Sequence, residues 1–369
     1  DDENQTSASR SFSITVQNIA PSDHFNTSIY NGSGASQSIT TGFAPDFTWI
    51  KSRSNGTWHC VADTVRGNLS RIFPNDAYQQ VTNNNGFLSF DSNGFNLDGQ
   101  GGGGDVNTSG RTYVAWSLKA GGAAVANTDG IISTQVSANT TLGFSVITYD
   151  GATNATADTS NNSGTYWNVA HGLGATPDLV LVKKTNGAGG WYVGGAALSS
   201  TGVNGNHLVL NATAAQVGEA NILWGGSQTF NATTFGLGGW DVVNRNGDSY
   251  LAYCFTSKPG MSKVGSYTGT GAAGNSVVTG FEPAFVMMKK TNSTSNWYIL
   301  DNKRNGPIGG NDGILFPNSS AAEDSSYNYI DFVANGFVLN FTNGDYNTSG
   351  GTYIYLAFAA DGSTATPSL

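Results

Sequence analysis

Charged residues and glutamate are scarce in this chain of 369 residues. Asp, Glu, Lys and Arg together make up 11% of the sequence, and Glu occurs only at positions 3, 219, 282 and 323. Because the long runs of Ala, Glu, Lys and Leu that favour helices are missing, we do not expect extended helices. The net charge is −9 and there is no basic stripe. This balance argues against a nucleic-acid partner, because such proteins concentrate Lys and Arg against phosphates.

Cysteine and long apolar runs are also rare. The chain has two cysteines, Cys60 and Cys254, so its stability is not expected to depend on a disulfide framework. No stretch of about 18–20 apolar residues occurs, and we therefore expect no membrane insertion. The sequence contains no phosphate-binding loop, dinucleotide fingerprint or nucleophile elbow, and its four histidines lack metal-ligand spacing.

Glycine, aromatic residues and repeated segments are abundant instead. The chain has 50 glycines and 11% aromatic residues, a composition that favours β-strands joined by tight turns. An apolar run that ends in Lys occurs three times, as FTWIK (47–51), LVLVK (179–183) and FVMMK (285–289). An aromatic closing segment also recurs, as YVAWSL, YLAYCF and YIYLAF. We interpret both runs as strands, and the first as either buried on both faces or facing a sheet partner.

The repeats divide the chain into three copies, each long enough for a domain of its own. The dense glycine turns predict an all-β protein of three tandem β-sandwich domains of jelly-roll or lectin-like type. The expected boundaries are 1–22 for a leading strand or linker, 23–122 for copy one, 123–141 for a linker, 142–259 for copy two, 260–361 for copy three and 362–369 for a tail. The alternating residues 9–22 predict a strand, which is either the last strand of a preceding immunoglobulin-like or cadherin-like module or a partner of the first sheet.

An aromatic residue followed by Asp and Arg is the first candidate site. It occurs in copies one and three, as Trp58, Asp63 and Arg66 and as Trp297, Asp301 and Arg304. Aromatic rings could stack on sugar rings while Asp and Arg bind their hydroxyl groups. The alternative is a core tryptophan with an ion pair beside it, since a tryptophan at a repeated position is more often buried.

A G-D-x-N-x-S-G segment is the second candidate site. Copies one and three place oxygen-bearing side chains two residues apart, at Asp105, Asn107 and Ser109 and at Asp345, Asn347 and Ser349. This spacing could wrap a calcium ion, but each loop offers a single carboxylate. The alternative is a turn that is closed by hydrogen bonds between side chains and backbone. No other cofactor is indicated.

Catalysis has little support in the sequence. A glycosidase needs two carboxyl groups about 5–10 Å apart, and glutamate is nearly absent. No carboxylate lies within an apolar strand, where burial would raise its pKa. We therefore expect a protein that is not an enzyme.

The repeated motifs together resemble a domain of undefined function that is common in virion proteins of marine bacteriophages. The resemblance covers about residues 23–360 and rests on segments such as TGFAPDFTWIKSR, YVAWSLKAGG, VVTGFEPAFVMMKKT and NTSGGTYIYLAFA. It implies a lectin-like sandwich in a tail fibre, tailspike or other protein of the virion surface. Copy two departs from the pattern, because it lacks the full G-D-x-N-x-S-G block and the Trp, Asp and Arg set.

These observations lead to an expected function. The leading hypothesis is a non-enzymatic phage protein, extracellular on the virion surface, that binds host-surface glycan. The alternatives are a purely structural capsid decoration or fibre shaft, and a glycan-degrading tailspike. Expected partners are other virion proteins and the glycan. Because phage attachment proteins are often trimeric, a homotrimer is one candidate assembly. The sequence contains no coiled-coil heptads that would encode a trimer.

Overall fold

The computed structural model describes residues 19–83, 86–99, 105–153, 166–198, 205–219, 223–225, 230–306, 308–342 and 344–361. Most of the strand expected at 9–22 lies outside these ranges, as does the tail at 362–369. The described chain opens with a 3-10 turn at Pro21–Asp23. Its two ends meet, since the Ser22 backbone N–H donates a 2.9 Å hydrogen bond to Asp361 Oδ1.

Copy one folds into two antiparallel sheets. Its larger sheet has the order β1-β9-β3-β4-β5-β6, and its smaller sheet has the order β2-β8-β7. The strands are β1 (Phe25–Asn31), β2 (Gln37–Thr40), β3 (Phe47–Ser52), β4 (Cys60–Asp63), β5 (Ser70–Ile72), β6 (Val81–Thr82), β7 (Phe87–Asp91), β8 (Gly94–Leu97) and β9 (Thr112–Leu118).

Copy two repeats this plan with additional strands. Its larger sheet runs β10-β11-β12-β19-β14-β15-β16-β17, and its smaller sheet pairs β13 with β18. The strands are β10 (Val125–Asn127), β11 (Thr134–Asn139), β12 (Phe144–Asp150), β13 (Trp167–Ala170), β14 (Leu179–Lys184), β15 (Trp191–Gly194), β16 (Gly205–Val209), β17 (Val217–Glu219), β18 (Thr234–Leu237) and β19 (Ser249–Phe255).

Copy three has the simplest sheets, β20-β26-β22-β23 and β21-β25-β24. Its elements are β20 (Ser262–Thr268), β21 (Asn275–Val278), β22 (Pro283–Lys290), β23 (Trp297–Asp301), β24 (Ile330–Val333), β25 (Gly336–Leu339), the short helix α1 (Gly344–Asn347) and β26 (Thr352–Ala359). The chain is therefore all-β, as the composition predicts, with pairs of antiparallel sheets that are consistent with β-sandwiches.

The Lys-ended run and the closing run of each copy are neighbouring strands at the centre of the larger sheet. Trp49 pairs with Trp116, Leu181 with Tyr253 and Met287 with Leu356. All residues of β3 and β22 are buried. The expectation of strands covered on both faces is confirmed, because one face meets the smaller sheet and the other meets the remaining two copies.

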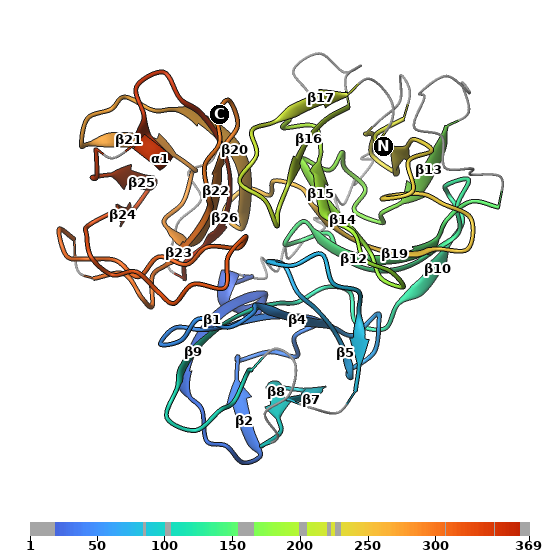
Figure 1. Cartoon of the computed structure of the whole chain (residues 1–369), viewed down its shortest axis with the longest axis horizontal. Helices are drawn as coiled ribbons and strands as arrows, with labels where there is room; N and C mark the ends of the chain where they lie inside the picture. Colours follow the sequence, from blue (N-terminus) through green and yellow to red (C-terminus); the bar gives the residue numbers. More distant parts are fainter. Residues whose placement is uncertain are drawn as a thin grey trace, which may run out of the picture.

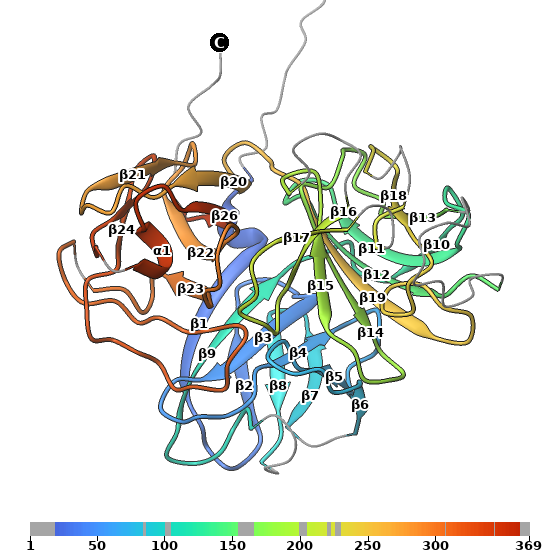
Figure 2. The same ribbon diagram turned by 45° about the horizontal axis from the view of Figure 1, so that its top comes forward.

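The three copies surround a common centre. In Figures 1 and 2 the larger sheets face one another in the middle, and the smaller sheets lie on the outside. We call these the inner and outer sheets. Separate apolar clusters fill the space between the inner and outer sheet of each copy. A further cluster joins all three inner sheets, so each copy has a core of its own and also shares one.

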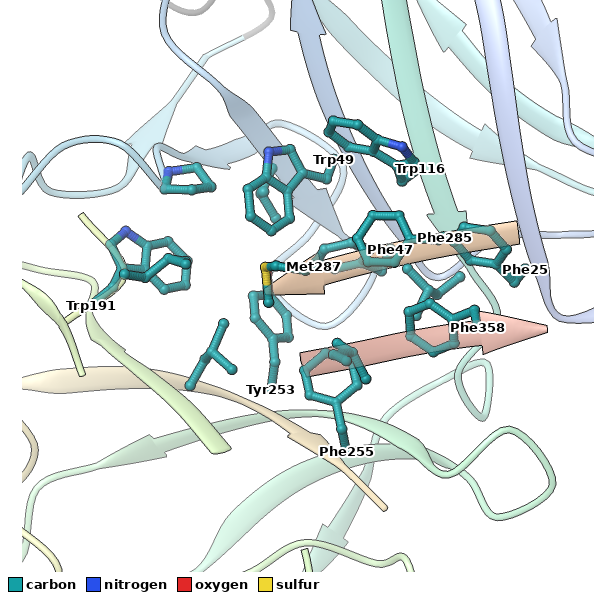
Figure 3. Close-up of a pocket in the computed structure, with 16 residues that line it drawn as sticks. Phe25, Phe47, Trp49, Trp116, Trp191, Tyr253, Phe255, Phe285, Met287 and Phe358 are labelled. Atoms are coloured by element: carbon teal, nitrogen blue, oxygen red, sulfur yellow. The ribbon is translucent and has the colours of Figure 1, made fainter. Parts of the chain in front are cut away.

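The shared interior is rich in aromatic rings. Phe25 stacks on Phe358 of copy three with a centroid separation of 4.9 Å, and Phe47 contacts Tyr253 of copy two edge to face at 4.9 Å. These rings line a void of about 30 Å³. Figure 3 shows how the four side chains converge. Apolar side chains line the void, and such a space stays dry. The void is lined by residues of all three copies, including Phe25, Trp116, Leu181, Trp191, Phe285 and Leu356.

The segment that we expected to be a linker between copies one and two belongs instead to the inner sheet of copy two. Residues 123–141 contain β10 and β11, which extend the inner sheet of copy two. Thr134 and Val136 are buried whereas Ser133 and Gln135 are exposed. This period-2 alternation is the pattern of a half-buried strand, and it is hidden in a stretch of small polar residues.

We predict that Phe285→Ala lowers the free energy of unfolding by about 3–5 kcal/mol. Phe285 is buried against Phe25, Trp116 and Phe358, with centroid separations of 5.7, 5.9 and 5.7 Å. Because these rings belong to two copies, we expect one cooperative transition when denaturant unfolding is followed by both fluorescence and circular dichroism. Separate transitions for separate copies would contradict the prediction. Val278→Ala, at an exposed position, is the control and should change stability by about 0.5 kcal/mol or less.

Candidate functional site

The contacts between copies, which we call seams, repeat around the ring. The first seam joins copies one and two, the second joins two and three, and the third joins three and one. At equivalent positions the N–H groups of Gln80, Gln216 and Glu323 donate to the carbonyls of Thr185, Thr291 and Arg53. The distances are 2.9, 2.8 and 2.8 Å. Each copy therefore contacts the next in the same head-to-tail manner, and the ring closes within one chain.

A ring nitrogen also crosses each seam. Trp191 Nε1 donates to Phe73 O at 2.9 Å, and Trp297 Nε1 donates to Val209 O at 3.0 Å. His59 occupies the equivalent place at the third seam, with Nε2 3.0 Å from Phe316 O. Trp49 Nε1 donates to His59 Nδ1 at 2.8 Å, so Nε2 carries the proton of the neutral ring. The structure therefore aligns His59, and not Trp58, with the tryptophans of the other copies.

Buried lysines lie next to the seams. Burial lowers the pKa of Lys51, Lys183 and Lys289, in each case to about 8. Their ammonium groups donate to backbone carbonyls, and two of them reach a neighbouring copy. Lys183 Nζ lies 3.2 Å from Ala77 O, and Lys289 Nζ lies 3.3 Å from Thr213 O. The lysine that ends each repeated strand therefore holds a loop by hydrogen bonds to its backbone carbonyls.

The Asp and Arg residues expected to bind sugar lie inside the first and third seams. Asp63 and Arg66 form an ion pair of 2.6 Å, and Asp301 and Arg304 form one of 2.7 Å. Asp63 Oδ2 also accepts a 2.8 Å hydrogen bond from Tyr253 of copy two. Asp301 Oδ2 accepts a 2.9 Å hydrogen bond from Trp116 Nε1 of copy one. Each pair therefore joins two copies.

Burial leaves these side chains almost no surface that a ligand in solvent could contact. Asp63 and Asp301 have 0% exposure, Trp297 has 1%, and the side chains of Arg66 and Arg304 have 3% and 0%. The expected sugar-binding role is corrected at these five positions, because their polar groups are used between copies. Trp58 is the exception, with 38% of its surface exposed.

The second seam solves the same packing problem without charge. Gly195, Leu198 and Leu356 occupy the positions that correspond to Asp63, Arg66 and Tyr253. Leu198 and Leu356 belong to the shared apolar interior. A side chain at Gly195 would place its Cβ 2.2 Å from Asp178 O, and the residue has a φ of +131°. Copy two lacks the Asp and the Arg, and copy three correspondingly has Leu356 where a hydrogen-bond donor faces the other two seams.

The G-D-x-N-x-S-G loops anchor a neighbouring turn. Asn107 Oδ1 accepts from Ser33 N at 2.9 Å, and its amide donates to Ala35 O at 2.7 Å. Asn347 repeats this with Thr270 N at 2.9 Å and Ala272 O at 2.8 Å.

The remaining members of the expected calcium set are also accounted for. Asp105 binds Arg111 and accepts from Tyr113 OH at 2.8 Å. Asp345 is exposed. Ser109 and Ser349 lie against Gly34 and Gly271 of the anchored turns. Among the described residues there is no group of three or more His, Cys, Asp or Glu side chains that could hold a metal. The loops fit the turn alternative, and we derive no calcium chemistry from them.

Copy one carries an exposed pair of aromatic side chains, Trp58 and Tyr78. The ring centroids of Trp58 and Tyr78 lie 6.1 Å apart at an angle of 46°, and Trp58 also contacts Phe73 at 5.1 Å. Tyr78 has 50% exposure. We call Trp58 and Tyr78 the aromatic platform.

The other two copies show that the fold does not need the platform. Asn75, Asn211 and Asn318 each accept a 2.8 Å hydrogen bond from the backbone N–H of His59, Trp191 and Trp297, respectively. This common bond aligns the loops. It places Gly190 and Asn296 at the position of Trp58, and Ala214 and Ala321 at the position of Tyr78. Tyr78 has no sequence motif of its own, and only this alignment of loops identifies it.

Together these features define a three-copy all-β protein that closes on itself around a shared apolar interior. A family model described as a domain of unknown function (DUF7483) matches residues 20–361 as one span, and the chain belongs to that family. No curated protein and no solved structure matches the chain. Within the described residues, no helix has the length and apolar character needed to cross a membrane.

We predict that the polar first seam can be converted into the apolar second seam. Asp63→Gly alone leaves Arg66 and Tyr253 buried without their carboxylate and should cost about 3–5 kcal/mol of stability. The triple variant Asp63→Gly, Arg66→Leu, Tyr253→Leu reproduces the residues of the second seam and should lose less than Asp63→Gly alone. Denaturant unfolding of both variants measures the difference. A triple variant that is less stable than the single one would contradict this account.

We also predict that His59 makes the protein sensitive to acid. Burial, with Lys51 nearby, lowers the pKa of His59 from 6.5 to about 3. Between these values the unfolded chain binds a proton that the folded chain does not, so stability falls as the pH drops below 6.5. The expected loss from this group at pH 5 is about 2 kcal/mol. Unfolding of the parent and of His59→Gln at pH 7 and pH 5 tests it, because the variant should lose less stability on acidification.

Proposed function

We propose that this chain is a non-catalytic virion-surface protein of a bacteriophage that attaches the particle to host-surface glycan through the aromatic platform. The observation that carries the proposal is the exposure of Trp58 and Tyr78 in the one copy that has them. Exposing an aromatic ring to water is unfavourable, and the fold does not require these two rings. Exposed aromatic groups of this kind mark binding sites. The likeness of the repeated motifs to phage virion proteins supports the setting, outside the cell and on the particle.

The platform suits the apolar face of a sugar ring. Trp58 is backed by Phe73, and the backbone N–H of Tyr78 donates to Asp76 Oδ1 at 2.8 Å, which fixes the start of the loop. Rings that are held in place lose little conformational freedom when a ligand binds. Other virion proteins are the expected structural partners.

A structural role in a capsid decoration or fibre shaft is the second candidate. The closed ring of three copies favours it, because the seams and the shared interior make a rigid body without a second chain. A homotrimer would place three similar units around one axis, and this chain already contains three such units in a ring. The position of the protein on virion particles distinguishes a decoration at the capsid from an attachment fibre.

We predict that Trp58→Gly with Tyr78→Ala, which copies the residues of copy two, weakens binding to host cells and to their polysaccharide about ten-fold or more. Stability should change by about 1 kcal/mol or less, since copy two folds with Gly190 and Ala214 at these positions. Trp58→Phe, which keeps an aromatic face, is the matched control and should retain most of the binding. Unchanged binding by the double variant would overturn the platform. Release of reducing sugar from the polysaccharide would favour the tailspike alternative instead.

A further inference from the structure

The first seam carries a groove of about 410 Å³ between copies one and two. Its walls and floor include Arg66 and Gln80 of copy one and Gln135, Thr148 and Ser249 of copy two. We propose that this groove binds an uncharged, hydroxyl-rich chain, such as a neutral oligosaccharide. The ligand class rests on the proposed function, but the site is distinct in its residues from the aromatic platform.

The floor of the groove belongs to the inner sheet of copy two. It is the part of that sheet face that continues beyond the shared apolar interior. Along β12, Phe144 and Val146 point into the shared apolar cluster, and Thr148 and Asp150 follow on the same face. Along β19, Leu251 belongs to the cluster and Ser249 lines the groove. The face therefore changes from apolar to polar where copy one stops covering it. A sheet face that emerges from a core with polar side chains is suited to a ligand that forms hydrogen bonds.

Two floor side chains are available for such bonds. Gln135 on β11 lies directly opposite Thr148 on β12, which places their side chains next to each other. Neither the Gln135 amide nor the Thr148 hydroxyl forms a side-chain hydrogen bond with the rest of the described residues. Gln135 is exposed and Thr148 is half-buried. One amide and one hydroxyl offer both donors and acceptors, as neighbouring sugar hydroxyl groups require.

The opposite wall is fixed before any ligand arrives. Gln80 Oε1 accepts from Arg66 Nη1 at 3.2 Å, and the Gln80 amide donates to Ser70 Oγ at 3.1 Å and Thr82 Oγ1 at 3.2 Å. Arg66 is held in turn by Asp63. The ion pair of the seam therefore supports the wall of the groove, and a wall of this kind keeps its shape on binding.

The charges around the groove favour a neutral ligand. The guanidinium of Arg66 is neutralised by Asp63 at 2.6 Å. Asp150 is exposed at the groove, with one carboxylate oxygen accepting a 2.7 Å hydrogen bond from Ser249 Oγ. An anionic ligand would meet this carboxylate without a free cation among the lining residues. Acidic sugars and nucleic acid are therefore disfavoured.

A peptide strand is disfavoured by the place of the groove on the sheet. The floor is a sheet face, and the backbone of β12 is already paired on both sides, with β11 and β19. A peptide that lies there could not add a strand through main-chain hydrogen bonds, which occurs at an open sheet edge. Side-chain bonds to a chain of hydroxyl groups need no free edge.

The groove depends on the strands that are specific to copy two. Ser133, Thr134 and Gln135 line it, and they come from the segment that adds β10 and β11 to the inner sheet. The inner sheets of copies one and three begin at β1 and β20, without such an addition. Ser266 of copy three corresponds to Thr148, because Ser266 pairs with Ile354 as Thr148 pairs with Leu251. It supplies a matched control position outside the groove.

The test uses the full chain and an array of neutral, sialylated and sulfated oligosaccharides, followed by calorimetry with the neutral oligosaccharide that binds best. We expect neutral oligosaccharides to bind. The double variant Gln135→Ala, Thr148→Ala should weaken this binding about ten-fold or more, because two hydrogen bonds are lost. Ser266→Ala should bind like the parent. Thermal unfolding of each variant checks that the sheet is intact, and all three substituted positions lie at least partly in solvent.

The outcomes separate the groove from the platform. If Gln135→Ala, Thr148→Ala binds like the parent while Trp58→Gly, Tyr78→Ala does not, the groove proposal is wrong and the platform stands. The reverse result supports the groove and overturns the platform. Binding of acidic oligosaccharides alone would overturn the neutral ligand class. If no oligosaccharide binds, the groove and the glycan function both fail.

Discussion

Three inner sheets bury the same kind of apolar face against one another, and the arrangement of the copies follows from this shared burial. A sandwich normally hides one face of each sheet, and the other face meets water. Here the second face carries Trp49, Tyr253 and Phe285 into a common interior. The three copies therefore cannot lie apart as separate beads without exposing large aromatic surfaces to water.

The seams combine an invariant part with a variable part. Backbone hydrogen bonds recur at all three, and they leave the neighbouring side chains free to differ. Two seams use a buried carboxylate with an arginine and a donor from the next copy. The other seam replaces the set with Gly195, Leu198 and Leu356. A buried ion pair and a well-packed apolar group are alternative solutions of similar stability, and the two sides of a seam have to match because a lone buried charge is costly.

The features that we connect with binding lie where the copies differ from one another. Trp58 and Tyr78 occupy positions where the other copies have smaller, non-aromatic residues, and β10 and β11 widen the sheet of copy two beside the first seam. The repeated residues maintain the ring, and the copy-specific residues give it two unlike surfaces. This division also explains why the repeated Asp and Arg residues are poor candidates for a ligand site.

Local composition and alternation are enough to predict the all-β class, the three copies, and the burial of FTWIK, LVLVK and FVMMK. The sequence also offers two interpretations of the G-D-x-N-x-S-G loops, and one of them is the turn with hydrogen bonds between side chains and backbone that the structure contains. The contacts of Asp63 and Asp301 with a neighbouring copy become visible only in the folded chain, since a sequence pattern shows that a residue is buried or repeated but not which surface covers it. The alignment of His59 with two tryptophans, the exposure of Tyr78 and the groove beside Gln135 likewise arise from contacts between segments far apart in the chain, and local propensity contains no information about them.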